Sequence, residues 1–173
     1  MCSSDLVSLR LVRIGTCGIL HPEIPVHSYI PSTHAYGLDN VAHFYEVPLT
    51  SEEKELNTVI SEHIQLPEKI QTYITEASEE IVKLLSSEKT ENGITVTSSG
   101  FYGPQGRQLR LKNRTAHLHD RLSSFRHDTH RITNFEMESS ALFSLGRALG
   151  HKCGTICLGI ANRPNKEFSS GYN

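Results

Sequence analysis

The sequence predicts an α/β fold, because segments with the apolar pattern of strands are followed by segments with the pattern of helices. Apolar residues alternate in the former and recur every three to four positions in the latter. The chain has 173 residues, of which 37% are hydrophobic. That is enough for one domain, which at this size buries roughly 70% of the surface of its unfolded chain. We expect a single domain over residues 7–173.

Residues 1–6 stand apart from this domain. They form a polar stretch that runs into the first predicted strand without a turn or a cap. Because a domain rarely begins in mid-strand, we expect residues 1–6 to be an appended, non-native segment and the native N-terminal portion to be absent. The domain over residues 7–173 would then be incomplete.

The composition favours a protein that acts on small molecules. The 17 Lys and Arg residues nearly balance 19 Asp and Glu residues, and the pI is near 6.5, which leaves no broad charged surface for nucleic acid or anionic lipid. The cysteines form no Cys-x-x-Cys pair, and neither a signal peptide nor an apolar run of membrane length occurs. We expect a cytoplasmic protein with reduced thiols that binds neither nucleic acid nor a membrane.

The first half of the chain is predicted to contain two strands and two helices. Residues 7–14 and 24–30 have strand patterns, and the polar residues 31–40 indicate a loop. Helical spacing of apolar residues marks residues 52–63 and 70–85.

The second half is predicted to add three strands and two helices. The strands cover residues 94–98, 131–135 and 152–161, with a short basic helix between the first two. A longer helix begins at Met137 and ends at Gly150, a residue type that commonly terminates helices.

The first strand is expected to end in a glycine-bracketed turn, Gly15-Thr16-Cys17-Gly18. Such a turn lets main-chain amides approach an anion, and Arg13 adds a fixed positive charge suited to phosphate. Taken alone, the same four residues are more often an ordinary tight turn. Other signals are therefore needed to identify an anion site.

A second informative segment is the loop over residues 99–107. Three glycines and a proline force an irregular path. The Gln105 amide can donate and accept hydrogen bonds, and Arg107 is a planar donor, so the pair suits a flat heterocycle whose carbonyls flank an N–H group. The alternative is a solvent-exposed turn in which the aromatic ring of Phe101 simply packs.

Two carboxylates flank a methionine where the strand at residues 131–135 turns into a helix. Acidic residues are favoured at a helix start, so capping explains one of Glu136 and Glu138. It does not explain a Glu-Met-Glu triplet at the end of a strand. The triplet is therefore also a candidate acceptor for the hydroxyl groups of a ligand.

Four histidines near the short basic helix raise the possibility of a metal site. Of the other ligand types, only Asp120 and Asp128 fall at a usual spacing. We therefore expect solvated or hydrogen-bonded histidines and no metal. The four are His117, His119, His127 and His130.

Polar groups thus come at the carboxyl ends of three predicted strands: Arg13 and Thr16, then Gln105 and Arg107, then Arg163. In an α/β sheet, ligands bind beyond the carboxyl ends of the strands. Arg13 can bind an anion, Gln105 and Arg107 can hydrogen-bond a planar heterocycle, and the Glu-Met-Glu triplet can accept hydrogen bonds from hydroxyl groups. Together these groups describe a site for phosphate, a base and a sugar.

Four motifs resemble, in the right order, those of uridine phosphorylases in the nucleoside phosphorylase superfamily. The resemblance runs over nearly all of residues 7–167 and implies a three-layer fold, with a central mixed sheet flanked by helices and truncated at the N-terminus. It implies a pentosyltransferase of pyrimidine salvage, which cleaves uridine with phosphate to uracil and ribose 1-phosphate. The motifs are Arg13-Ile14-Gly15-Thr16-Cys17-Gly18, Phe101-Tyr102-Gly103-Pro104-Gln105-Gly106-Arg107, Asn134-Phe135-Glu136-Met137-Glu138-Ser139 and Ile160-Ala161-Asn162-Arg163.

The resemblance implies roles for nine residues. Arg13 and Thr16 would hold the attacking phosphate. Phe101 would pack against the nucleoside, while Gln105 and Arg107 would hydrogen-bond the uracil carbonyls and N3–H.

The remaining residues would bind the sugar and the far edge of the base. Met137 and Glu138 would bind the ribose hydroxyls, with Glu136 as a supporting carboxylate, and Arg163 would lie near the uracil edge. Arg107 would neutralise charge on the departing uracil, while Glu138 would orient a sugar that becomes positive. These two are the expected catalytic residues. Uridine and phosphate would be the ligands, with no metal and no organic cofactor.

Two features of the family pattern are missing. Family members usually begin with a further portion that contains a Gly-Asp-Pro-type phosphate loop, and they borrow a phosphate-binding arginine from a neighbouring subunit. Neither occurs upstream of Arg13. The resemblance implies that a full-length parent is an active homo-oligomer, at least a dimer, while a fragment need not be active.

Other functions stay open at this stage. A purine nucleoside phosphorylase would share the phosphate and ribose motifs, but it should carry an acidic base reader near the last strand, and residues 160–165 contain none. A nucleosidase would use water in place of phosphate, against which Arg13 argues. A catalytically silent nucleoside-binding fragment is the alternative from another class. The choice among uridine, thymidine and deoxyuridine is also open.

Overall fold

The computed structural model describes residues 7–115 and 117–170, so the expected appended segment, residues 1–6, lies outside the described part. The strands are β1 (Arg10–Ile19), β2 (Tyr29–Gly37), β3 (Tyr73–Glu76), β4 (Gly93–Thr97), β5 (Arg126–His127), β6 (His130–Glu136), β7 (Lys152–Asn162) and β8 (Glu167–Phe168). The helices are α1 (Ser51–Ile64), α2 (Glu79–Leu85), α3 (Leu118–Ser124) and α4 (Ser139–Ala148), with 3₁₀ helices η1 (Val41–Phe44) and η2 (Gly103–Gln105).

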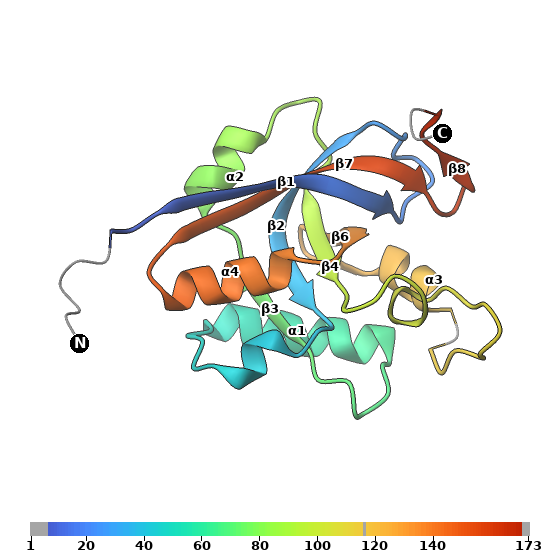
Figure 1. The fold of residues 1–173 in the computed structure, drawn as a ribbon, viewed down its shortest axis with the longest axis horizontal. Coiled ribbons are helices and arrows are strands. Elements are labelled where there is room, and N and C mark those ends of the chain that lie inside the picture. Colours follow the sequence, from blue (N-terminus) through green and yellow to red (C-terminus); the bar gives the residue numbers. More distant parts are fainter. Residues whose placement is uncertain (1–6, 116, 171–173) are drawn as a thin grey trace.

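The strands form a mixed sheet with the order β3-β2-β4-β6-β1-β7-β8. β4 lies parallel to β2 and β6, and β1 lies parallel to β7, whereas β6 and β1 are antiparallel. β2 also pairs with β7, so the sheet curves round on itself. Figure 1 shows β1 and β7 running side by side across the molecule. The predicted α/β fold with a mixed sheet is confirmed.

Helices cover both faces of this sheet. Successive residues of a strand point to opposite faces, and in β7 Cys153 lies against Gly146 of α4 while Gly154 lies against Ile81 of α2. At each glycine an added Cβ atom would overlap the opposing side chain. Helices α2 and α4 therefore lie on opposite sides of the sheet (Figure 1), which confirms the predicted three-layer arrangement.

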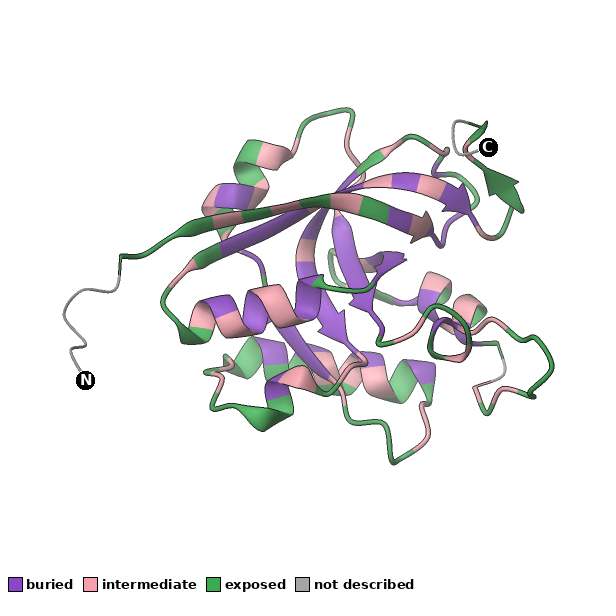
Figure 2. Cartoon of the chain, viewed as in Figure 1, coloured by how far each residue is buried: buried purple, intermediate pink, exposed green. Residues whose placement is uncertain are grey.

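The largest core cluster joins the sheet to α1 and α3. Ile60 and Ile64 of α1 and Leu122 of α3 are buried together with Tyr36 of β2 and Phe135 of β6. Figure 2 shows buried residues concentrated in the central strands, whereas the outer turns of the helices are exposed. Burial of each such side chain contributes roughly 1.5–3 kcal/mol, so this cluster fixes α1 and α3 against the sheet.

Helix α1 confirms the helix predicted at residues 52–63. It begins with a capping box, in which the Thr50 hydroxyl accepts from the Glu53 amide at 3.1 Å and the Glu53 carboxylate accepts from the Thr50 amide at 2.8 Å. The same buried carboxylate accepts hydrogen bonds from Arg147 of α4 at 2.6 and 2.7 Å. The cap of one helix thus also joins it to another.

The single helix predicted at residues 70–85 is wrong, because this segment forms the strand β3 and then the shorter helix α2. Tyr73 and Ile74 point to opposite faces of the sheet and are both buried. The strand therefore shows no alternation, and its apolar residues continue the spacing of the helix that follows. The Ala77 amide donates to the Thr33 carbonyl at 2.9 Å, a tertiary contact that holds the break between the two elements.

The strand predicted at residues 24–30 and the loop predicted at residues 31–40 are also wrong. Strand β2 occupies most of the expected loop, where Pro31 and several polar residues resemble a turn. Pro31 lies where β2 changes its partner from β7 to β4, beside a register shift between Ser32 and His34. A strand tolerates the missing amide of proline at such an irregularity.

The other predicted elements are confirmed as β1, β4, β6, β7, α3 and α4, although β1 runs from Arg10 to Ile19 and not over the predicted residues 7–14. Helix α4 ends before Gly150, which has φ +75°, a left-handed conformation that favours glycine. None of the helices in the described part of the chain is long and apolar enough to cross a membrane.

Strand β1 has a free edge over most of its length. It pairs with β7 from Arg10 to Ile19 but with β6 only at Gly18 and Ile19. The side chains of Val12 and Ile14 are 46% and 83% exposed beside that edge. Within residues 7–115 and 117–170, no strand completes the pairing of β1 there.

Candidate active site

All nine residues that the sequence assigned to substrates line one cavity of about 490 Å³. Four parts of the chain supply them: β1, the loop after β4, the junction of β6 with α4, and the residue that follows β7. A cavity of this volume suits a small-molecule ligand. The lining residues predicted from the sequence are Arg13, Thr16, Phe101, Gln105, Arg107, Glu136, Met137, Glu138 and Arg163.

The glycine-bracketed turn predicted at residues 15–18 is wrong. These residues lie inside β1, which pairs with β7 across them with a register shift just before Gly18. The glycines allow close approach instead: a Cβ atom on Gly15 would lie 2.5 Å from Arg13 Nη1, and one on Gly18 would lie 2.7 Å from Arg163 Nε. Two guanidinium groups thus lie directly over the strand backbone, and the candidate anion binder is the Arg13 side chain, not the main-chain amides of a turn.

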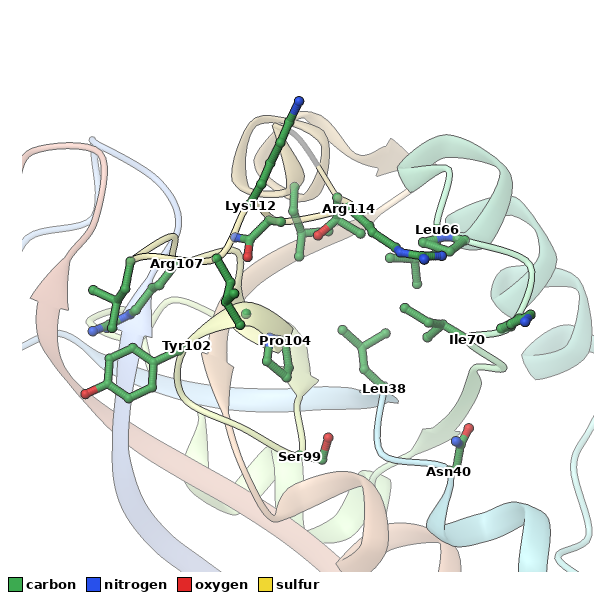
Figure 3. Close-up of a pocket in the computed structure, with 18 of the residues that line it drawn as sticks. Leu38, Asn40, Leu66, Ile70, Ser99, Tyr102, Pro104, Arg107, Lys112 and Arg114 are labelled. Atoms are coloured by element: carbon green, nitrogen blue, oxygen red, sulfur yellow. The ribbon is translucent and has the colours of Figure 1, made fainter.

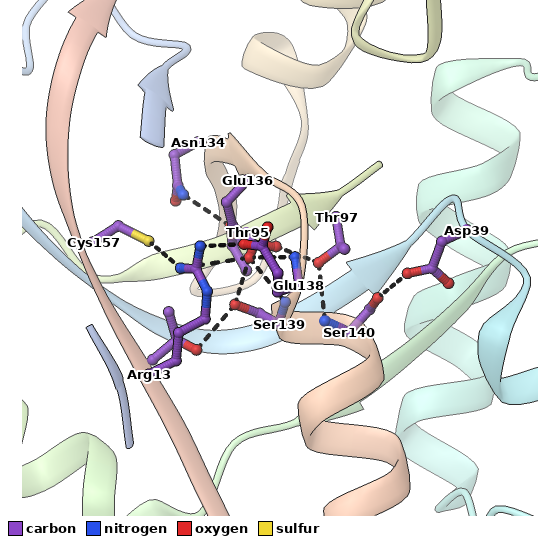
Figure 4. Close-up of polar contacts among 11 residues, drawn as sticks. Arg13, Asp39, Thr95, Thr97, Asn134, Glu136, Glu138, Ser139, Ser140 and Cys157 are labelled. Carbon is purple, nitrogen blue, oxygen red and sulfur yellow. Dashed lines mark hydrogen bonds and ion pairs between the residues drawn. The ribbon is translucent and has the colours of Figure 1, made fainter. Parts of the chain in front are cut away.

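Arg13 lies at the centre of a charge cluster (Figure 4). Its Nη2 donates to the Glu138 carboxylate, while its Nη1 lies 3.6 Å from Glu136 Oε2 and donates to Cys157 Sγ at 3.2 Å. Burial lowers the pKa of the Arg13 guanidinium, but these neighbours, led by Glu136, outweigh burial and raise the pKa above its ordinary value. Arg13 is therefore a permanent cation. An anionic ligand would compete with Glu138 for it.

Glu136 is the more deeply placed of the two acids. Its side chain is fully buried, and its carboxylate accepts hydrogen bonds from the Glu138 amide and from the amide and hydroxyl of Ser139, each at 2.8 Å. The Thr97 hydroxyl donates to its other oxygen. An acid that accepts from the first amides of α4 caps that helix. Capping therefore explains Glu136, whose position suits a supporting carboxylate.

Glu138 has a different environment. Its side chain is 58% exposed, and Arg13 is its partner in an ion pair. Met137, between the two acids, is 40% exposed and lines the same cavity. The Glu138 carboxylate is therefore free to turn from Arg13 to the hydroxyl groups of a ligand.

The loop after β4 forms the other end of the cavity. Gln105 is only 2% exposed, and Arg107 lies over the ring of Phe101, with its Cζ 3.7 Å from the ring centroid. Arg163 donates from Nη1 to the main-chain carbonyl of Gln105 at 3.0 Å and from Nη2 to the Gln105 side-chain oxygen. Both oxygens of Gln105 are therefore held by one guanidinium group.

The two arginines at this end repel each other. Burial lowers the pKa of Arg163 to about 10, and the charge of Arg107 adds to the effect. Burial also lowers the pKa of Arg107. Two neighbouring guanidinium groups create a positive field at this end, which would stabilise negative charge on a departing group.

Further residues that no sequence motif marks hold the acids in place (Figure 4). The Ser140 amide donates to the Thr97 hydroxyl at 2.9 Å, and the Ser140 hydroxyl donates to Asp39 at 2.5 Å. The Tyr73 hydroxyl also donates to Asp39, at 2.6 Å. Two small hydroxyl residues directly after the Glu-Met-Glu triplet were the one available signal, because such residues favour helix starts.

The histidines around α3 contact protein groups. His117 Nδ1 lies 3.2 Å from the Asp120 carboxylate, and His130 packs edge-on against His34, with ring centroids 5.0 Å apart. Among the residues that the structure describes, no group of three or more His, Cys, Asp or Glu is placed to hold a metal ion.

A second, larger cavity of about 1100 Å³ lies beside the site (Figure 3). Leu38 and Ile70 contribute apolar lining, while Lys112 and Arg114 are basic. In Figure 3 the Lys112 side chain points away from the cavity. Of the nine predicted site residues, Arg107 alone lines this cavity. The predicted residues therefore mark the smaller cavity.

Two curated relatives match this chain over most of its length. The chain is 29% identical over 171 residues to the uridine phosphorylase of Haemophilus influenzae and 26% identical over 157 residues to that of Thermococcus kodakarensis. The alignments cover 97% and 91% of this chain, but 61% and 50% of the relatives. The chain thus spans between half and two thirds of the length of these relatives.

Solved structures and a family model agree with these relatives. A Trypanosoma brucei nucleoside phosphorylase, described as showing uridine phosphorylase activity, is 27% identical with a TM-score of 0.82, over 94% of this chain and 57% of that one. A structure from work on uridine phosphorylases of the oomycete Phytophthora capsici is 20% identical with a TM-score of 0.57, over 95% of this chain and 59% of that one, a likeness of fold alone. A sequence model of the phosphorylase superfamily matches residues 6–169. Because that match covers almost the whole chain, the chain belongs to the phosphorylase superfamily.

Proposed function

We propose that the protein is a uridine phosphorylase, which converts uridine and inorganic phosphate to uracil and ribose 1-phosphate. The observation that carries the proposal is the single cavity that combines a cation, paired acids and an amide-guanidinium loop. The activities named for the relatives from Haemophilus influenzae, Thermococcus kodakarensis and Trypanosoma brucei support it. Because the chain spans 50–61% of the curated relatives, the proposal concerns the whole protein.

Phosphate binds beside Arg13 and Thr16. The Arg13 guanidinium exchanges the Glu138 carboxylate for phosphate, to which it donates charge-assisted hydrogen bonds. That exchange frees Glu138 to accept hydrogen bonds from the ribose hydroxyls. Binding of phosphate and binding of ribose are therefore coupled through one ion pair.

The reaction breaks the bond between ribose C1′ and uracil N1 as a phosphate oxygen attacks C1′ from the opposite face. Glu138 orients the ribose and tolerates the positive charge that develops on it. Arg107 neutralises the negative charge that the departing uracil carries away with the bonding electrons. Both charges are larger in the transition state than in bound uridine, so these contacts lower the barrier. Phosphate is a co-substrate, and the scheme uses no metal or organic cofactor.

Gln105 and Arg107 select the base. A side-chain amide and a guanidinium group together offer hydrogen bonds to the two carbonyls of uracil and its N3–H. A purine nucleoside phosphorylase would be expected to carry an acidic residue that binds the base near the end of β7. Residues 160–165 contain neither Asp nor Glu. The composition of the site therefore favours a pyrimidine nucleoside.

A nucleoside-binding fragment without turnover is the second candidate. Of the described cations that line the cavity, Arg13 alone lies beside the acids, while Arg107 and Arg163 lie at the base end. One guanidinium group that already pairs with Glu138 holds a phosphate dianion weakly. This observation favours binding without turnover for the chain as it stands.

The proposal is tested by following uracil release from uridine with and without phosphate. Phosphate-dependent release that Arg13→Ala abolishes supports phosphorolysis. Arg10→Ala is the matched control, because Arg10 lies on the same strand and pairs with Glu80 at the surface. Release that ignores phosphate would contradict the phosphorylase assignment, and uridine binding without release would favour the second candidate.

A further inference from the structure

His119 lies behind the base-reading end of the cavity without lining it. It belongs to α3, and its ring centroid is 5.8 Å from that of Phe135 in the core. Its Nε2 atom lies 2.5 Å from the main-chain oxygen of Gln105 and 3.0 Å from Arg163 Nη1. The motifs of the site do not include His119.

These contacts determine which ring nitrogen carries the proton. A carbonyl oxygen only accepts hydrogen bonds, so the contact with Gln105 requires a proton on His119 Nε2. Arg163 Nη1 then donates to the same carbonyl at 3.0 Å rather than to the ring. His119 and Arg163 together hold one carbonyl oxygen with two donors.

The surroundings of the ring favour its neutral form. Burial lowers the pKa of His119, and the charges of Arg163 and Arg107 lower it further, while the Gln105 carbonyl and Asp120 oppose the shift. A protonated ring would stand beside the Arg163 guanidinium as a second cation. Protonation would therefore push apart the two groups that hold the Gln105 carbonyl.

The anchored carbonyl fixes what Gln105 can offer a ligand. Arg163 Nη2 occupies the Gln105 side-chain oxygen, and no described residue accepts a hydrogen bond from Gln105 Nε2. The next residue, Gly106, has φ +73°, and a Cβ atom there would lie 3.1 Å from His119 Nε2. Both the left-handed turn and the close approach of His119 therefore favour glycine at this position.

We propose that His119 is a positioning residue for base selection: its Nε2–H anchors the Gln105 carbonyl so that the Gln105 side-chain amide presents N–H donors to a carbonyl oxygen of a pyrimidine base. His119 acts through Gln105 and touches no reacting atom. The inference rests on the proposed function, because that function supplies the base.

Two measurements on the chain test the inference. Long-range ¹H–¹⁵N spectra identify the protonated ring nitrogen of His119 without any ligand, and calorimetry gives the affinity for uridine between pH 5.5 and 7.5. His119→Phe keeps a ring but removes the donor, and His119→Gln restores a neutral N–H donor that does not titrate. His117→Asn is the matched control, because the His117 side chain is exposed and Asn tolerates its left-handed backbone.

The inference predicts a proton on Nε2 and an affinity for uridine that His119→Phe weakens roughly tenfold, as expected when the Gln105 carbonyl loses one of its two donors. His119→Gln should stay close to wild type at pH 7.5, because its side-chain amide restores a neutral N–H donor. Phosphate affinity should not change in either variant, and His117→Asn should match wild type throughout.

A proton on Nδ1, wild-type uridine affinity in His119→Phe, or a loss of affinity in His119→Gln as large as in His119→Phe would each overturn the inference. The first result is measured on the wild type, so it decides the matter even where His119→Phe does not fold. A wild-type chain that binds neither uridine nor uracil would instead overturn the proposed function, and the base-selecting role with it.

Discussion

Glu136 and Glu138 are two residues apart and chemically identical, and both lie beside Arg13, yet their burial and their other contacts differ. Glu136 is buried among donors from Thr97 and Ser139, whereas Glu138 is more than half exposed and pairs with Arg13. A buried carboxylate whose oxygens accept hydrogen bonds from the protein stabilises the fold. An exposed carboxylate beside a cation can exchange that cation for another partner. The two acids therefore separate into a structural residue, Glu136, and a candidate ligand-binding residue, Glu138.

Replacing these acids by their amides should separate the two roles. Glu136→Gln should lower the free energy of unfolding by about 2–4 kcal/mol, because an amide NH₂ then faces donors that need an acceptor. Glu138→Gln should change stability by less than about 1 kcal/mol, as expected at an exposed ion pair, but should weaken uridine binding. Urea unfolding and calorimetry on both variants measure this, and equal loss of stability in the two would contradict it.

His34 in β2 should make stability depend on pH. Burial, followed by repulsion from His130, lowers the pKa of His34 from 6.5 to about 4. Between these values the unfolded chain binds a proton that the folded chain does not, so the free energy of unfolding falls as pH drops from 6.5 to 4. The loss is complete below pH 4 and amounts to at most about 3 kcal/mol.

The variant His34→Gln isolates this contribution, because glutamine does not titrate. Urea unfolding at pH 7.5, 5 and 4 should show a smaller decline for the variant than for the wild type. An identical decline in both proteins would show that other groups account for the acid sensitivity.

At the level of single residues, the sequence predicted the residues that line the cavity better than the residues that hold them in place. Arg13, Gln105 and Glu138 have side chains whose chemistry suggests a ligand wherever they occur together. Thr97 and His119 are ordinary polar residues, and only their distances from Glu136 and Gln105 reveal what they do. No spacing in the sequence contains that information.

Among the elements, the closest packing is that of α4 on β7. Gly146 of α4 lies where a Cβ atom would overlap Cys153 Sγ. Replacing glycine by alanine inside an exposed helix usually stabilises it by about 1 kcal/mol. Here Gly146→Ala should instead destabilise the protein by about 1–3 kcal/mol, because the helix must move off the strand.

The double variant Gly146→Ala/Cys153→Ala tests that cause. Removing the sulfur makes room for the new methyl group, so the two changes together should cost less than the sum of the single changes. Chemical unfolding of the four proteins gives the coupling directly, and additive effects would exclude the contact as the source.

How well each helix or strand could be predicted from the sequence depended on how it packs in the fold. Helix α1 was recognisable because one face is solvated and its capping box is local in sequence. β2 and β3 were not, because strands that are buried on both faces show no alternation, and the polar residues of β2 are paired through partners far away in the chain. Tertiary contacts determine the secondary structure of these two segments, and the local sequence pattern does not predict it.

At the scale of the whole molecule, the free edge of β1 is a place where another strand could pair. Unpaired main-chain groups beside apolar side chains are a template for another strand, and Ile14 is 83% exposed there. Ile14→Lys should therefore reduce concentration-dependent association of the chain without loss of fold. Leu84→Lys, at an exposed position on α2, is the control. Sedimentation velocity measures the effect, and unchanged association in Ile14→Lys would locate the contact elsewhere.

The fold class was predictable because it depends on many segments at once, so errors in two strands did not alter it. The motifs also predicted correctly which distant segments meet in one cavity. The curvature of the sheet and the free edge of β1 arise from how the strands pair, and the second cavity arises where loops distant in the sequence meet. No local pattern encodes these features.

A crystal structure of the protein with uracil and phosphate tests the central claim most directly. The claim predicts uracil between Gln105 and Arg107 and phosphate within hydrogen-bonding distance of Arg13, in one continuous cavity. Phosphate bound instead at the basic rim of the larger cavity, beside Lys112 and Arg114, would contradict it.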